Sequence, residues 1–281
     1  MLPSRRSSLS LCLLVGSLAC ASARTSSTAG TASPALGANG ASCPREANWS
    51  PAPTVSPLPE APTAQQLAGV ERTRNDWANL ARYREANATL GDPAPGEARV
   101  VFMGNSITDA WAKSFPAMFP GKPYIGRGIS GQTTPQMLVR FRQDVIALKP
   151  KVVVILAGIN DIAGNTGPST QAMIADNLMS MTEIAKANGI RVVLSSVLPA
   201  YDFPWRRGIE PAPKVVALNA WLKCYAAQVG AVYLDYYTKL VDARGGLSPE
   251  MASDGVHPTE AGYRIMAPLA EAAIQEALRG R

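Results

Sequence analysis

The sequence predicts an α/β fold in which helices cover both faces of a parallel β-sheet. A strand followed by a helix, repeated along the chain, is typical of such sheets. The run KVVVILAG is apolar without alternation, as expected of a strand that is buried on both faces. Five apolar runs are expected to form the strands, at 99–104, 122–126, 151–158, 190–199 and 231–237.

Helical patterns separate these runs in a regular order. One helix precedes the first strand, and one follows each of the other four. The expected helices are 75–88, 135–148, 169–189, 212–230 and 259–278. Gly189 and Gly230 stand where helices should end, because glycine readily adopts the left-handed conformation that closes a helix. Ligands bind at the carboxyl ends of the strands in such sheets, so functional residues are expected there.

The N-terminal part of the chain is expected to lie outside this fold. Residues 1–23 combine a basic start, a short apolar run and small residues, which is typical of a secretory signal peptide. Cleavage near Ala23 and lipidation at Cys20 are the two alternatives, and both predict a secreted or periplasmic protein. Residues 24–62 are rich in Ala, Ser, Thr and Pro and are expected to form a disordered leader. Residues 63–281 then make one domain.

Composition excludes several classes of function. The net charge of +6 is mild and the basic residues are scattered, so no nucleic-acid partner is expected. No transmembrane segment is expected beyond the signal. A single histidine and dispersed cysteines give no zinc-ligand spacing, so neither a metal nor another cofactor is predicted. Cys43 and Cys224 either form a disulfide or remain two thiols. The sequence does not indicate an oligomeric state.

Residues suited to acyl transfer follow the strands. Ser106 comes after the first strand, and the only histidine, His257, stands three residues after Asp254 in the loop before the last helix. A serine hydroxyl needs a base, and a carboxylate that orients the imidazole also stabilises its charged form. The N–H groups of Ser106 and Gly131 and the side-chain amide of Asn160 are candidate oxyanion donors.

Four sequence blocks resemble the SGNH hydrolase superfamily, the GDSL-type esterases and lipases. In chain order they are Gly104-Asn105-Ser106-Ile107, Gly131, Gly158-x-Asn160-Asp161 and Asp254-x-x-His257. Asn105 departs from the pattern, because the family name carries aspartate there. The resemblance implies a flavodoxin-like three-layer α/β/α sandwich with a five-stranded parallel sheet, and hydrolysis of esters or thioesters without a metal.

The residues and the resemblance together predict a serine-dependent carboxylic ester hydrolase, an acyl or acetyl esterase that forms an acyl-enzyme. Its Ser106, His257 and Asp254 would form the catalytic triad. The expected substrate is a small ester, such as an acylated carbohydrate or lipid. A lysophospholipase or thioesterase of the same fold, an acyltransferase, and a non-catalytic carbohydrate-binding module are the alternatives.

The loop after the fourth expected strand is a candidate for substrate binding. Its sequence, LPAYDFPWRRGIEPAP at 198–213, is long for such a connection. Loops on a rigid scaffold commonly carry binding residues. Trp205 would supply a flat apolar surface and Arg206 hydrogen-bond donors for an anionic group. The alternative is that the aromatic residues only hold the loop onto the domain.

Overall fold

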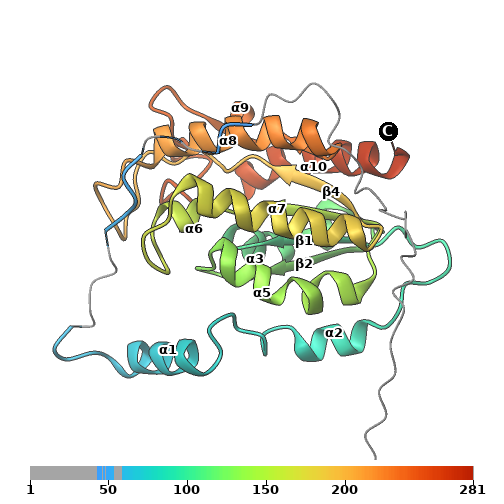
Figure 1. The fold of residues 1–281 in the computed structure, drawn as a ribbon, viewed down its shortest axis with the longest axis horizontal. Helices are drawn as coiled ribbons and strands as arrows, with labels where there is room; N and C mark the ends of the chain where they lie inside the picture. Colours follow the sequence, from blue (N-terminus) through green and yellow to red (C-terminus); the bar gives the residue numbers. More distant parts are fainter. Residues whose placement is uncertain (1–42, 46, 48, 54–58, 281) are drawn as a thin grey trace, which may run out of the picture. The chain divides into compact units, whose positions relative to one another are not determined.

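Five parallel strands form the centre of the fold, in the order β2-β1-β3-β4-β5. Figure 1 labels β1, β2 and β4 of this sheet among the helices that surround it. The computed structural model describes residues 43–45, 47, 49–53 and 59–280. This strand order is that of flavodoxin-like folds, so the predicted fold class is confirmed. The strands are β1 (Val100–Gly104), β2 (Tyr124–Gly128), β3 (Val152–Leu156), β4 (Arg191–Ser195) and β5 (Val232–Leu234).

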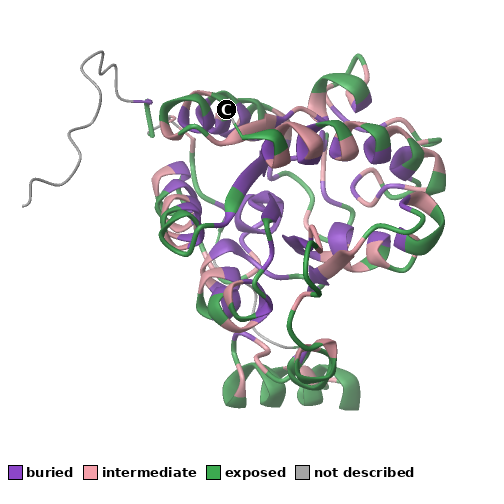
Figure 2. Ribbon diagram, turned by 90° about the vertical axis from the view of Figure 1, so that its right-hand side faces the viewer, coloured by how far each residue is buried: buried purple, intermediate pink, exposed green. Residues whose placement is uncertain are grey.

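Two hydrophobic cores lie between the sheet and the two layers of helices that pack on its faces. Val101 and Met103 of β1 belong to one core, and Val100 and Phe102 to the other, because successive side chains of a strand point to opposite faces. Residues of α5 (Thr134–Asp144), α7 (Gln171–Ala187) and α8 (Pro211–Val229) complete the first core. Residues of α3 (Ser106–Ala112), α4 (Phe115–Met118) and α10 (Glu260–Arg279) complete the second. Figure 2 shows the buried centre of this sandwich.

The prediction of one helix at 75–88 is wrong. The structure has α1 (Ala64–Asn75) and α2 (Arg84–Leu90), with turns between them. The carboxylate of Asp76 explains the interruption, because it accepts hydrogen bonds from the backbone N–H groups of Leu80 (2.7 Å) and Ala81 (2.9 Å). Such side-chain contacts offer the backbone an alternative to a continuous helix. No residue of α1 is buried.

Short helices make up the rest of the secondary structure. They lie next to strand or helix ends and have too few turns to show a periodic pattern in sequence. They are the 3₁₀ turn η1 (Ile146–Leu148), α6 (Ile159–Ile162) and α9 (Tyr237–Leu240). In the part of the chain that the structure describes, no helix is both long enough and apolar enough to cross a membrane.

Part of the expected leader is attached to the domain. Cys43 forms a disulfide with Cys224 of α8. Lys214 donates to the carbonyl oxygen of Ser50 at 3.0 Å, and Ala52 is buried. The expectation of a disordered leader through residue 62 is therefore wrong for these residues, because a covalent bond and burial offset their ordering entropy. The expected signal peptide and Cys20 lie outside the described residues.

Candidate active site

The carboxyl end of β1 presents Ser106 as the first residue of α3. Asn105 caps this helix, because its side-chain oxygen accepts a hydrogen bond from the N–H of Ile107 at 3.1 Å. Gly104 makes the tight turn possible. A Cβ there would lie 2.1 Å from Oγ1 of Thr108, so no larger residue fits without displacing the first turn of α3. The fold thus holds the Ser106 hydroxyl at the edge of the sheet.

His257, 151 residues further along the chain, contacts this hydroxyl, and Asp254 contacts the other side of the histidine ring. Oγ of Ser106 lies 2.8 Å from Nε2 of His257. Nδ1 of the same ring lies 2.6 Å from Oδ2 of Asp254. A neutral ring that donates from Nδ1 to the carboxylate leaves Nε2 free to accept the serine proton.

Asp254 is fixed by a turn of its own backbone. Its Oδ1 accepts hydrogen bonds from the N–H groups of Val256 (2.9 Å) and His257 (2.8 Å). Partial burial acts to raise the pKa of Asp254, but the hydrogen bonds from the His257 ring and these two N–H groups outweigh it. The pKa of Asp254 is therefore lowered, and the group stays ionised at neutral pH.

The loops that carry Gly131 and Asn160 are joined to each other. The side-chain amide of Asn160 is buried and donates one N–H to the carbonyl oxygen of Gln132 at 2.9 Å. The same amide carries a second N–H group. Gly131 adopts a φ of 81°, which a residue with a side chain rarely does. The two candidate oxyanion donors thus belong to one hydrogen-bonded unit.

Asp161 reinforces the same unit. In the sequence Asp161 only completes the Gly158-x-Asn160-Asp161 block, whereas the structure buries it completely against the start of α5. Its carboxylate accepts from the backbone N–H of Thr134 at 3.0 Å and from the Thr134 hydroxyl at 2.6 Å. Burial raises the pKa of Asp161 to about 6, against the opposing effect of these hydrogen bonds.

The loop after β4 places Trp205 beside the histidine. The ring centroids of Trp205 and His257 lie 6.0 Å apart. Trp205 stacks on the fully buried Phe203 with centroids 5.2 Å apart, so its exposed face is held in place. Arg206 turns inward, and its guanidinium donates to the carbonyl oxygens of Ala163 (2.6 Å), Gly164 (2.9 Å) and Pro53.

A cavity of about 510 Å³ lies next to Gly131 and Trp205. Several amide and hydroxyl side chains line it, together with Trp205 and Arg206. Sequence reasoning missed the other polar residues of this wall, because they carry no motif and come from separate segments of the chain. They include Asn79, Gln132, Gln136, Asn165 and Thr166. No metal-sized cluster of His, Cys, Asp or Glu exists among the described residues.

Comparison with known proteins identifies the family of this chain. The model of the GDSL-like Lipase/Acylhydrolase family matches residues 102–265, which include every residue of the Ser106–His257–Asp254 chain. The protein belongs to this family. A solved GDSL-like lipase from Bacteroides thetaiotaomicron is 50% identical to this family member, with a TM-score of 0.69, over 72% of this chain and 100% of that one.

Two curated relatives extend the comparison. An acetylxylan esterase of Geobacillus stearothermophilus is 26% identical over 205 residues, 60% of this chain and 90% of the relative. The uncharacterized lipoprotein YqeF of Bacillus subtilis is 35% identical over 82 residues, 28% of this chain. That match spans only 33% of the length of YqeF. The family and the named esterase place this chain among the carboxylic ester hydrolases.

Proposed function

We propose that this GDSL family member is a serine-dependent carboxylic ester hydrolase that works through an acyl-enzyme. One observation carries the proposal: Ser106, His257 and Asp254 form a continuous hydrogen-bonded chain, with contacts of 2.8 Å and 2.6 Å. This arrangement supports Ser106 as nucleophile, His257 as general base and Asp254 as the group that orients the ring.

In the first half of the reaction, Oγ of Ser106 attacks the acyl carbon of the ester and its proton passes to Nε2 of His257. His257 then gives this proton to the departing alcohol, which leaves an acyl group on Ser106. In the second half, His257 takes a proton from water, and the resulting hydroxide attacks the acyl carbon. This attack gives a tetrahedral intermediate, and its collapse releases the acid and returns the proton from His257 to Ser106.

Negative charge develops on the carbonyl oxygen of the ester in both halves. The N–H groups of Ser106 and Gly131 and the second N–H of the Asn160 amide are the donors that we assign to it. Each such donor typically lowers the barrier enough to speed the reaction by roughly 10²- to 10³-fold. The joined loops of Gly131 and Asn160 would hold two of these donors in place before substrate arrives.

An acyl ester of a carbohydrate is the substrate that the site supports best. The cavity beside Gly131 is lined by amides and hydroxyls, which suit the hydroxyl groups of a sugar. Trp205 offers a flat face for a sugar ring, and Arg206 lies at the same wall. The acetylxylan esterase relative acts on a substrate of this class, as its name states. The side chain of His257 is 36% exposed, so water can reach the acyl-enzyme and hydrolysis is favoured over transfer.

The decisive experiment compares Ser106→Ala and His257→Ala with a surface control. Both variants should keep the fold but lose at least about 10³-fold in kcat on acetyl esters, because nucleophile and base act as a unit. A fluorophosphonate should label Ser106 and no other serine. Ser180→Ala, a change on α7 where the hydroxyl only contacts the Asp176 carbonyl, should behave as wild type. Full activity of Ser106→Ala would refute the proposed function.

A further inference from the structure

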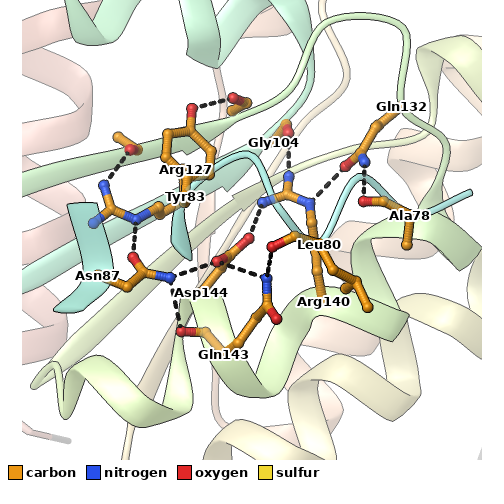
Figure 3. Close-up of polar contacts among 12 residues, drawn as sticks. Ala78, Leu80, Tyr83, Asn87, Gly104, Arg127, Gln132, Arg140, Gln143 and Asp144 are labelled. Atoms are coloured by element: carbon orange, nitrogen blue, oxygen red, sulfur yellow. Dashed lines mark hydrogen bonds and ion pairs between the residues drawn. The ribbon is translucent and has the colours of Figure 1, made fainter. Parts of the chain in front are cut away.

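Arg140 is a charged side chain that is completely buried on α5 (Figure 3). Its guanidinium donates to three acceptors from separate parts of the chain. They are the side-chain oxygen of Gln132 at 2.5 Å, the carbonyl oxygen of Gly104 at 3.0 Å and the carboxylate of Asp144 at 2.9 Å. Burial of a guanidinium is costly unless each N–H group finds a partner, so this site is built around the arginine.

Two of the three acceptors adjoin groups of the proposed mechanism. Gly104 ends β1, one residue before the Asn105 cap and two before Ser106. Gln132 follows Gly131, and its backbone carbonyl receives the Asn160 hydrogen bond. The guanidinium therefore bridges the end of the nucleophile strand and the loop of the oxyanion donors, although it contacts no reacting atom.

The third acceptor holds the arginine itself in place. Asp144 is also completely buried, and it supplies the opposite charge one turn further along α5. The amide of Asn87 donates to this carboxylate at 2.7 Å, and the amide of Gln143 approaches it at 3.4 Å (Figure 3). The short contact with Asn87 fixes the carboxylate, so the guanidinium keeps one orientation, and the longer contact with Gln143 contributes little to it.

The segment between α1 and α2 closes this buried cluster from outside. Three backbone carbonyls of the segment accept from amide side chains on or next to α5. Gln132 donates to Ala78 at 2.7 Å, and Gln143 donates to Leu80 at 2.8 Å. Gln136 donates to Trp77 at 2.7 Å. Water is thereby kept from the charged pair, which strengthens its interactions.

We propose that Arg140 is a positioning residue that sets the separation between the Ser106 nucleophile and the oxyanion donors of Gly131 and Asn160. The inference rests on the proposed function, since it assigns no chemistry of its own to Arg140. A planar guanidinium reaches Gly104 and Gln132 at once, whereas the single ammonium of lysine would hold one of them. A displacement of about 1 Å between reacting groups costs roughly 10²-fold in rate.

The test removes the buried pair as a unit, because Arg140→Met alone would leave Asp144 charged and without its cation. The double variant Arg140→Met with Asp144→Leu should lower kcat on an acetyl ester about 10- to 100-fold and leave KM within about two-fold. Arg140→Lys, which keeps the charge but not the planar fork, should show an intermediate loss. Both are assayed well below their own melting temperatures.

Gln143→Met is the matched control. It removes hydrogen bonds to Leu80 and Asp144 from the same network but touches neither Gly104 nor Gln132. Its kcat should stay near wild type even if its melting temperature falls as far as that of the double variant. An equal loss of kcat in Gln143→Met would overturn the proposal, because the effect would then belong to general stability.

The remaining outcomes are also decisive. A folded double variant with wild-type kcat would overturn the positioning role. If the double variant does not fold, Arg140→Lys decides, since an unchanged kcat contradicts the proposal and a loss of about tenfold or more at constant KM supports it. Failure of the proposed function is separate, and would show as activity of Ser106→Ala on the same ester.

Discussion

Asp161 illustrates how one buried residue connects stability to the site. Its carboxylate joins α6, which carries Asn160, to the first N–H of α5 through Thr134. Since burial raises the pKa of Asp161 to about 6, the carboxyl group holds its proton more tightly in the folded protein than in the unfolded chain. The stabilising contribution of the protonated form is therefore lost as the pH rises from the ordinary value of 3.8 through about 6.

Asp161→Asn should remove this pH dependence. The difference in unfolding free energy between the variant and wild type should shift in favour of the variant by roughly 2 kcal/mol between about pH 4 and about pH 7. Urea unfolding of both proteins at the two pH values measures it. Groups such as Asp254, whose lowered pKa acts in the opposite direction, titrate in both proteins and cancel in the difference. A constant difference would contradict the assignment.

The loop after β4 combines two roles that the sequence leaves as alternatives. Phe203 is fully buried and fixes the loop, while Trp205 is 47% exposed and stacks on it. Arg206 binds backbone carbonyls, a contact that sequence reasoning did not foresee because carbonyl acceptors have no sequence signature. Phe203 thus anchors the loop, whereas Trp205 presents an apolar surface to the solvent.

Trp205→Ala should raise KM for an acetylated oligosaccharide about 5- to 20-fold, as expected when an aromatic stacking surface worth roughly 1–2 kcal/mol is lost. Because the ring is half exposed, the melting temperature should change little. Val139→Ala is the control, since it truncates an exposed apolar side chain on α5. A fall in melting temperature without a change in KM would assign Trp205 to anchoring alone.

The disulfide between Cys43 and Cys224 decides between the two states that the sequence permits for these cysteines. It closes a loop with a sequence separation of 181, and long closed loops lose much entropy in the unfolded chain. The double variant Cys43→Ser with Cys224→Ser should lose about 2–4 kcal/mol of unfolding free energy. Thermal unfolding with and without a phosphine reductant measures this, and wild-type protein that is insensitive to the reductant would contradict it.

At the scale of the whole molecule, the long elements are predictable from sequence and the connections between them are not. The run at Val152–Leu156 indicates a buried strand because all its positions are apolar. Helices α7, α8 and α10 span four or more turns, so their patterns are visible. The four-residue helix α6 carries Asn160 and Asp161 but is too short to show a period.

The candidate site follows the same division. Ser106, Gly131, Asn160 and His257 could be predicted as site residues because parallel strands end at one edge, and each residue follows or faces such an end. The Arg140 network could not be found this way. Apart from the Asp144 contact along one helix, its hydrogen bonds join residues whose proximity depends on packing of α5 against β1 and the turns at 76–83.

The disulfide also divides the polypeptide into a covalent ring, a segment before it and a tail after it. Ser106 lies within the ring closed by Cys43 and Cys224, whereas His257 lies in the tail beyond it. A protease that cuts the loop at Arg207, whose side chain is 80% exposed, would separate these two residues into different peptides. The fragments would nevertheless stay bonded, so a nicked molecule migrates as one species until it is reduced. A cut between Cys224 and Asp254 would instead leave no covalent link between the histidine and the serine.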